Sequence, residues 1–349
     1  MDPSNDEATG HIPRDCVALL GRHAIRELQV DLNYHNLSTE IEQLCVIRPE
    51  TYVSEKFVRQ VMDQKQHEPP VDPSLLQIQV SDDVPLDIAR KLQVAFTKYK
   101  HVFRIEPKLP RPMLGEPYAF KIKPNATYPT CPPPRYTPAK AKYLTQVVRS
   151  GLESGLLESA YDSPIVSRIH IALKPGDPPG LRDCGDYVEV NDRIEKIAPD
   201  FSKIPDEVEK FASARFFFET DAAAFYNLIT LCESTRDWTT VHTPLGKVRW
   251  TRMPFGIKNA GTIAHSRLRE YLRKLPDDTF HRLANYFDDI TGGAIDHEVL
   301  LTDFIALLEI CDRFHITLGI KKTRFGFKSA KFGGFQLGDG KRSLAQRNL

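Results

Sequence analysis

Three aspartates have the spacing and surroundings of a divalent-cation site. Asp288 and Asp289 are adjacent, follow the aromatic pair Tyr286-Phe287 and precede Ile290. Strand-forming residues on both sides of two acids are typical of a tight β-hairpin with the acids at its turn. Carboxylate oxygens are hard ligands of the kind that Mg²⁺ prefers. By itself the pair is also compatible with a solvated Asp-Asp turn.

A third acid, Asp221, ends the aromatic stretch 214–220, which predicts a buried strand. An acid at a strand end that faces an acidic hairpin is the arrangement of a two-metal phosphoryl-transfer site. Two cations clamp the attacking and leaving oxygens and neutralise charge that develops on the phosphoryl group. Asp221, Asp288 and Asp289 are therefore the candidate catalytic residues and metal ligands.

Seven motifs, in order along the chain, include these acids. They resemble the reverse transcriptase of gypsy-type LTR retrotransposons from about residue 88 onward. The stretches that carry the resemblance are Arg135-Tyr136-Thr137-Pro138, 155–159 with 163–167, 181–187 with Asn191, 218–221 with Tyr226, 243–246 with 253–260, 286–289 and 331–335.

The resemblance implies an α+β fold of the polymerase right-hand type, with fingers, a ferredoxin-like palm and a thumb that is largely missing. It also implies an RNA-directed DNA polymerase that extends a primer 3′-hydroxyl with deoxynucleoside triphosphates on an RNA or DNA template. The implied cofactor is two Mg²⁺ ions, with Mn²⁺ as a substitute. The implied partners include the ribonuclease H and integrase parts of a pol polyprotein, and the implied location is a cytoplasmic virus-like particle with a nuclear phase.

The resemblance assigns a role to each further site residue. Lys174 and Arg182 hold the triphosphate, Tyr226 rejects a 2′-hydroxyl, and Phe255 and Gly256 approach the nucleotide. Phe287 lies near the primer end, Gly333, Gly334 and Phe335 form the primer grip, and Lys321, Lys322 and Arg324 lie near phosphates. Asp289 supports the two main ligands. Two plainer readings stay open, namely Lys174 as a surface lysine and Tyr226 as a core residue.

Several positions depart from the family pattern. Phe225 stands beside Tyr226 where the family has a small residue, so it could crowd the sugar pocket. Gly261 replaces a common Pro, Val188 replaces an Arg, and Phe335 replaces a His. The alternative function is therefore a degenerate, non-catalytic retroelement remnant that only binds nucleic acid. An aspartic protease is excluded because the chain lacks Asp-Thr/Ser-Gly.

Composition fits an intracellular nucleic-acid enzyme. The chain has 349 residues, 41% of them hydrophobic, and a net charge of +1. Positive charge is concentrated in 101–149 and 321–349, which flank an acidic centre and suit phosphate backbones. No run of about 18 apolar residues occurs, so no membrane span is expected. The six cysteines form no Cys-x-x-Cys pair, which favours a reducing compartment.

The chain divides into three predicted parts. Residues 1–36 resemble the C-terminal end of a retropepsin-like protease, 37–87 read as a linker, and 88–349 form the reverse transcriptase fingers and palm. Capping residues and apolar spacing predict the main helices. These helices are expected at 87–100, at 138–157 with Thr137 as cap, at 206–213, from Asn259 to Leu275 and from Asp296 onward.

Overall fold

The computed structural model describes residues 58–59, 62, 78–104, 109–174, 180–338 and 341–344. The predicted protease remnant, 1–36, lies outside the described residues. Of the predicted linker, Val58 and Met62 are buried in the main core, and Gln79–Val80 forms a strand. The linker interval therefore includes two core residues and a strand that pairs with β10.

Five strands form the central sheet, in the order β1-β10-β5-β9-β8. β1 runs parallel to β10, and every other neighbouring pair is antiparallel. The predicted buried strand before Asp221 is β5, at the middle of this sheet. The strands are β1 (Gln79–Val80), β5 (Phe216–Asp221), β8 (Leu283–Tyr286), β9 (Asp289–Ala294) and β10 (Arg324–Phe327).

Two long helices complete a ferredoxin-like unit. In chain order the elements run β5, α8, β8, β9, α10, β10, which is a β-α-β-β-α-β sequence around an antiparallel sheet. α8 spans Ala260–Leu272 and α10 spans His297–Phe314. The predicted ferredoxin-like palm is confirmed, and with it the α+β class.

Alternation along β5 gives the sheet two buried faces. Phe218 packs into the main core with α8, α10 and α4, which spans Leu86–Tyr99. Phe217 packs on the opposite face, in a smaller cluster with Phe211, Ala284, Phe332 and Leu337. That cluster lies under the helix α7 (Ile204–Glu209) and a second sheet. The strands of this sheet are β11 (Ser329–Phe332), β12 (Phe335–Gly338) and β13 (Lys341–Leu344).

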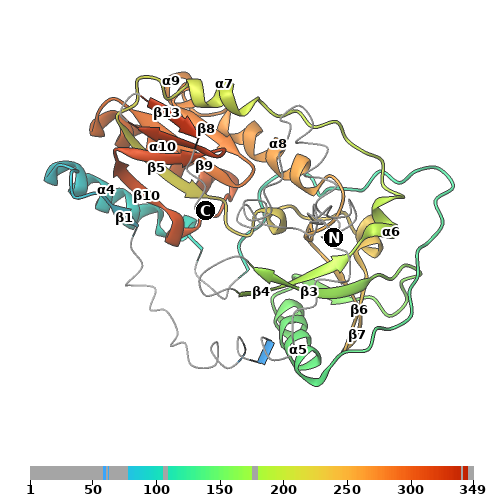
Figure 1. The fold of residues 1–349 in the computed structure, drawn as a ribbon. Helices are drawn as coiled ribbons and strands as arrows, with labels where there is room; N and C mark the ends of the chain where they lie inside the picture. The colour runs from blue at the N-terminus through green and yellow to red at the C-terminus, as the bar shows by residue number, and fades with distance from the viewer. Residues whose placement is uncertain are drawn as a thin grey trace, which may run out of the picture.

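The predicted fingers combine residues between α4 and β5 with the strands of 241–250, which follow β5. Figure 1 shows the palm elements in one part of the molecule and β3, β4, β6, β7 and α5 in another. β3 and β4 pair as a hairpin, and β2, β7 and β6 form a small sheet. The elements are α5 (Pro138–Glu153), β2 (Leu157–Ser159), β3 (Arg168–Lys174), β4 (Gly180–Asp186), α6 (Val188–Asn191), β6 (Val241–Thr243) and β7 (Gly246–Trp250).

Short helical segments connect these parts. η3 follows β5, which ends at Asp221, and η5 precedes β10, which pairs with β5. The segments are η2 (Lys100–Val102), η3 (Phe225–Leu228), η4 (Glu233–Thr239), α9 (Asp277–His281) and η5 (Ile320–Lys322).

The helix predictions are partly confirmed. Asp296 caps α10 by accepting a hydrogen bond from Val299 N at 2.8 Å. Thr137 precedes α5 but makes no side-chain capping bond. α5 ends at Glu153 rather than near 157, because Gly155 takes a left-handed φ of 73° and stops the helix. α7 begins two residues before the predicted 206 and ends at Glu209.

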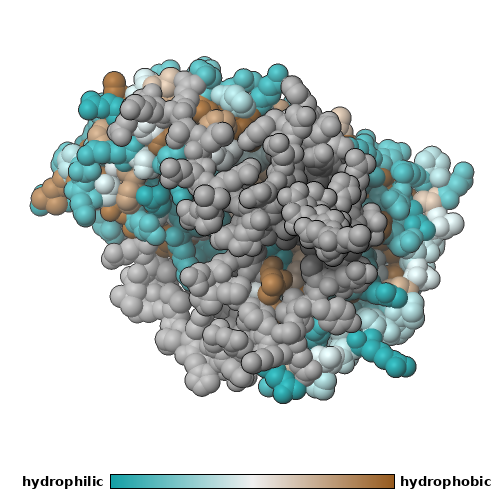
Figure 2. All heavy atoms as spheres, in the orientation of Figure 1, coloured by the Kyte–Doolittle hydropathy of each residue, from teal (hydrophilic) through white to brown (hydrophobic). Residues whose placement is uncertain are grey.

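Figure 2 shows mainly hydrophilic residues on the described part of that face, with hydrophobic residues scattered among them. Within the described ranges, no helix combines the length and the apolar character that crossing a bilayer requires.

Candidate functional site

The predicted acidic hairpin is present and tight. β8 and β9 pair up to Tyr286 and Asp289, so Phe287 and Asp288 alone form the connecting loop. Two-residue hairpin loops require left-handed backbone, and Phe287 has a φ of 52°. Ala222 N, just after β5, donates a 2.7 Å hydrogen bond to Asp288 O. The turn is therefore tied directly to the end of the strand that carries Asp221.

The sheet brings the three predicted acids together. Asp221 lies directly opposite Asp289 in the antiparallel pairing of β5 and β9. Residues in that position point their side chains to the same face of a sheet, with Cβ atoms about 5 Å apart. Asp288 follows Phe287 in the adjoining turn. Residues distant in sequence thus form one acidic site at the end of the central strands.

Burial and mutual repulsion disfavour the charged carboxylates. Burial, followed by the charge of Asp289, raises the pKa of Asp288 to about 6. Burial also raises the pKa of Asp221, which is 9% exposed. These groups would bind a nearby positive charge strongly, because such a charge would relieve both effects.

Lys322 supplies that positive charge. Its Nζ lies 2.8 Å from Asp221 Oδ2. Burial acts to lower the pKa of Lys322, but the hydrogen bond to Asp221 and the charges of the three aspartates outweigh it and raise the pKa. That Lys322 and Arg324 lie near phosphates stays a prediction; in this structure Lys322 contacts Asp221, and Arg324 is paired with Glu219 at 2.8 Å.

The donor set suits a hard cation. Asp221 Oδ1 is buried and has no hydrogen-bond partner. A Cβ added at Gly319 would lie 2.1 Å from that oxygen, so the glycine leaves it room. Among the residues that the structure describes, no three His, Cys, Asp or Glu side chains are grouped closely enough to hold a metal ion as they stand. The acids fit the chemistry of Mg²⁺, with the Lys322 ammonium beside Asp221.

Three of the predicted nucleotide-binding residues form a connected group. The Arg182 guanidinium lies 4.5 Å from the centre of the Phe255 ring. That ring meets the Tyr226 ring edge to face, with centroids 5.1 Å apart. Lys174 lies opposite Gly180 in the register of β3 and β4, two residues from the position of Arg182. This group links the fingers hairpin to η3, which follows the strand that carries Asp221.

Gly256 is held by an asparagine that the sequence left without a role. It has a φ of 86°, and its carbonyl accepts a hydrogen bond from Asn191 Nδ2 at 2.9 Å. Asn191 Oδ1 in turn accepts from Lys258 N at 2.7 Å. Asn259 also fastens a loop, by accepting from Ile197 N at 3.1 Å, and makes no capping bond to α8. These asparagines connect segments far apart in sequence, so spacing alone gives no signal for them.

Phe225 is a core residue whose ring lies beside that of Tyr226, with centroids 5.6 Å apart. Its side chain is 6% exposed and belongs to the main core. Ala224, just before it, has a left-handed φ of 52°, which starts η3. Tyr226 is only partly buried and packs against the edge of the same core. The reading of Tyr226 as a purely internal residue is therefore disfavoured.

The predicted primer grip is a second tight hairpin. β11 and β12 pair up to Phe332 and Phe335, so Gly333 and Gly334 form the turn, with φ values of 56° and 89°. This conformation favours glycine at both positions. Phe335 packs in the smaller core cluster together with Tyr286, the last residue of β8. The two hairpins are therefore linked through one apolar cluster.

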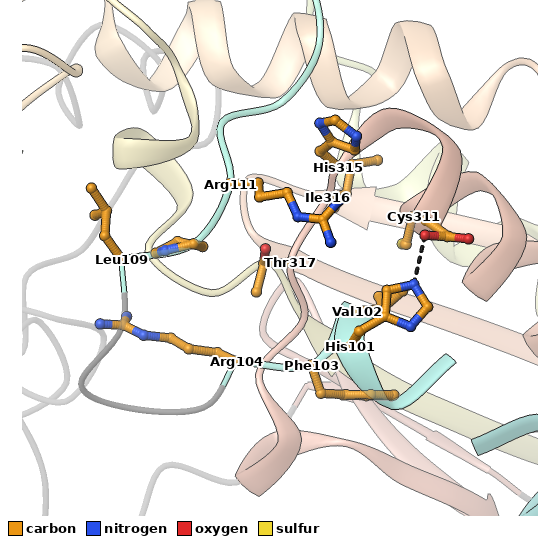
Figure 3. Close-up of a pocket in the computed structure, with 12 residues that line it drawn as sticks. His101, Val102, Phe103, Arg104, Leu109, Arg111, Cys311, His315, Ile316 and Thr317 are labelled. Atoms are coloured by element: carbon orange, nitrogen blue, oxygen red, sulfur yellow. Dashed lines mark hydrogen bonds and ion pairs between the residues drawn. The ribbon is translucent and has the colours of Figure 1, made fainter. Parts of the chain in front are cut away.

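A cavity adjoins the segment that follows Asp221. It measures about 420 Å³ and is lined by 101–104, 109–111, 311–312 and 315–317 (Figure 3). His101 Nε2 lies 2.7 Å from Asp312 Oδ1 at its edge. None of the predicted site residues lines it. Its wall at Thr317 adjoins the site, because Thr317 O accepts a hydrogen bond from Ala223 N.

Comparison with known families agrees with this geometry. Residues 181–337 match the family described as reverse transcriptase (RNA-dependent DNA polymerase), and that interval includes all three acids. The chain contains a reverse transcriptase domain. Its relatives include the Pol polyproteins of the Drosophila melanogaster transposons 412, at 25% identity over 52% of this chain, and gypsy, at 26% over 55%. The domain is thus of the gypsy type.

The reverse transcriptase domain is a small part of those relatives. The match covers 14% of the transposon 412 polyprotein and 19% of the gypsy polyprotein. A Gag-Pol polyprotein of feline leukemia virus is 28% identical over 57% of this chain, which corresponds to 12% of that polyprotein.

Solved structures show the same fold. A foamy viral protease-reverse transcriptase in complex with double-stranded DNA superposes with a TM-score of 0.65 at 17% identity, over 85% of this chain and 52% of that one. A complex of the foamy viral protein with an RNA/DNA hybrid gives a TM-score of 0.63 at 16% identity, over 85% of this chain and 37% of that one. The predicted polymerase fold is confirmed.

Proposed function

We propose that this domain is the RNA-directed DNA polymerase of a retrotransposon polyprotein, and that it extends a primer 3′-hydroxyl by two-metal nucleotidyl transfer. The observation that carries the proposal is the pairing of Asp221 opposite Asp289, with Asp288 in the adjoining turn. Asp221 and Asp288 would hold Mg²⁺, with Asp289 in support. Once bound, the ions supply a clamp for the attacking and leaving oxygens and neutralise charge on the phosphoryl group.

The chain's own residues supply binding and selection. Arg182 presents a guanidinium fork, which suits triphosphate oxygens, and its contact with Phe255 fixes its approach. Lys174 is proposed to assist as a point charge. Tyr226 acts as a steric wall against a 2′-hydroxyl, and Phe255 and Gly256 border the nucleotide. Asp221 and Asp288 keep the metal charge at the end of β5.

The polynucleotide partners are proposed to be an RNA or DNA template and a primer. The foamy viral proteins of the same fold were solved with double-stranded DNA and with an RNA/DNA hybrid. Phe287 would lie near the primer end, and Gly333, Gly334 and Phe335 would position its backbone. Such contacts fix register and carry no sequence information.

The remaining assignments follow from membership of a polyprotein. We propose ribonuclease H and integrase domains as partners, and a virus-like particle in the cytoplasm with a nuclear phase as the location. Residues 1–36 as a protease remnant, 37–87 as a linker and 88–349 as the polymerase remain the proposed division. The rival proposal is a non-catalytic remnant that only binds nucleic acid.

Primer extension tests the proposed function. The full chain is incubated with an RNA template, a DNA primer, deoxynucleoside triphosphates and Mg²⁺, with a chelator in the control reaction. Extension that requires both the template and the divalent cation is expected. Binding of the primer–template without any extension, in Mg²⁺ and in Mn²⁺, would favour the non-catalytic remnant.

Tyr226→Ala should weaken sugar selection. Without the ring, a 2′-hydroxyl meets no wall, so the incorporation ratio of ribonucleotides to deoxynucleotides should rise by about tenfold or more, since specificity of this kind depends on pocket shape. Single-nucleotide incorporation rates measure the ratio. Tyr226→Phe is the matched control, because it keeps the ring and removes only the hydroxyl. An unchanged ratio in Tyr226→Ala would place the gate elsewhere.

Lys322→Gln should destabilise the metal-free fold, because the buried acids lose their counter-charge. We expect the free energy of unfolding to fall by about 1 kcal/mol, the scale of one charged hydrogen bond with an exposed partner. Added Mg²⁺ should stabilise the variant more than the parent. Denaturant titrations with and without Mg²⁺ measure both values, with Lys321→Gln as the neighbouring control. If the difference in the free energy of unfolding between parent and variant is the same with and without Mg²⁺, the result would contradict a cation site at these acids.

A further inference from the structure

The turn that carries Asp288 is not self-stabilising. Phe287 has a φ of 52°, and left-handed backbone is disfavoured for a residue with a bulky side chain. A glycine or asparagine would adopt it more readily. Other parts of the structure must therefore hold the turn in place, and the position of the Asp288 carboxylate depends on how firmly they do so.

His265, on α8, contacts this turn through its ring and through Nδ1. Its Nδ1 accepts a hydrogen bond from Phe287 N at 3.2 Å. The two rings meet edge to face with centroids 5.9 Å apart, and Phe201 packs against both. A Cβ at Gly261 would lie 2.8 Å from the Phe287 ring. Gly261, which stands where the family commonly has a proline, therefore leaves space for this ring.

The bond defines the chemical state of His265. A nitrogen that accepts from a backbone N–H cannot carry a proton, so Nδ1 is bare and the neutral ring carries its proton on Nε2. His265 is 2% exposed, and its Nε2 has no partner. Burial and the nearby Arg269 charge lower the pKa of His265 to about 4, against the opposing charges of Glu207 and Asp200.

A polar network meets the same nitrogen of the ring. Asn285 Nδ2 lies 3.4 Å from His265 Nδ1, and Asn285 Oδ1 accepts from Arg269 Nη1 at 3.3 Å. Arg269 Nη2 also donates to Glu207 Oε1 at 2.7 Å. Asn285 therefore presents its amide nitrogen, and not its oxygen, to the histidine. The network runs from α7 through α8 to the turn.

We infer that His265 is a positioning residue for the metal-binding turn: as a neutral acceptor, it holds the Phe287 backbone so that Asp288 stays aligned with Asp221. This inference rests on the proposed function only in calling the turn metal-binding. The hydrogen bond, the ring packing and the Asn285–Arg269 network carry the rest. Disturbing the acceptor should loosen the turn and weaken cation binding without touching a carboxylate.

Two variants separate the acceptor from the packing. In His265→Asn the side-chain oxygen takes the place of Nδ1, whereas His265→Leu fills similar space with no acceptor. Amide hydrogen exchange at Phe287, measured by NMR on the metal-free full chain, should be about tenfold faster in His265→Leu and close to the parent in His265→Asn, as expected for the loss of one hydrogen bond. The Mg²⁺ dissociation constant, measured by calorimetry, should rise by a similar factor in His265→Leu alone.

Two exchange results would overturn the inference: an unchanged Phe287 amide in His265→Leu, or equal acceleration in both variants. If neither variant folds, ¹⁵N NMR of the unchanged chain decides. A His265 ring protonated on Nδ1 at neutral pH would refute the inference, and the Nε2–H tautomer is expected. Absence of primer extension by the parent would overturn the proposed function and leave the exchange and tautomer results standing.

Discussion

Asp288→Asn is expected to abolish primer extension and, without divalent cations, to make the fold more stable. The amide lacks the charge that a hard cation requires, so the activity is lost. The same charge is unfavourable in the metal-free chain, because burial and Asp289 raise the pKa of Asp288 to about 6. Removing it should add about 1 to 2 kcal/mol to the free energy of unfolding, after allowance for the partial exposure of the turn.

The raised pKa of Asp288 also predicts how the stability of the metal-free chain changes with pH. A carboxyl whose pKa is raised from 3.8 to about 6 in the folded chain binds its proton more tightly when folded. The metal-free parent should therefore gain stability as the pH falls from about 6 towards 3.8, and Asp288→Asn should lack this gain. Denaturant titrations in a chelator at several pH values measure it. Asp162→Asn, at an exposed position, is the control. A variant less stable than the parent at pH 7 would contradict the argument.

Arg282→Ala is expected to cause the largest loss of stability among these variants. Arg282 donates to both oxygens of Asp303 at 2.7 and 2.8 Å, and Asp303, on α10, is 1% exposed. Without the guanidinium, Asp303 keeps only the 2.7 Å bond from Thr279 among the hydrogen bonds in the described chain. Breaking a buried pair from one side costs about 3 to 5 kcal/mol, because a buried charge is left uncompensated.

An exposed ion pair to the same helix serves as the matched control. Lys91 lies 2.6 Å from Glu298, and their side chains are 52% and 60% exposed. Lys91→Ala should therefore change stability little, since water replaces the lost partner. Thermal or denaturant unfolding of both variants measures the contrast. Equal losses in the two variants would show that burial of Asp303 does not decide the effect.

The placement of the three acids was predictable from sequence because local patterns encode it. An aromatic run that ends in Asp221 and an acidic pair between strand-forming residues specify two strands and a turn, whatever surrounds them. The cap of α10 at Asp296 was also predictable from local sequence. The end of α5 at Glu153 was not predicted correctly, because it depends on the left-handed backbone at Gly155.

The surroundings of the site could not be predicted in this way. Lys322 pairs with Asp221, and His265 meets Phe287, only because η5 and α8 pack beside the acids. Each contact joins residues from different elements, and no spacing along the chain records it. Basic character near the C-terminus predicts phosphate contacts for Lys322. Net charge alone does not identify the partner of a side chain, so it gives no signal for the contact with Asp221.

The close fit between Gly292 and Phe218 limits how this palm can change over time. The two residues lie opposite each other on β9 and β5, and a Cβ at Gly292 would lie 2.3 Å from the Phe218 ring. That ring packs in turn against Phe304, with centroids 5.1 Å apart. A larger residue at 292 is therefore accessible mainly to lineages that have first acquired a smaller one at 218. The two positions should covary among homologous sequences, with the order of substitution fixed by sterics.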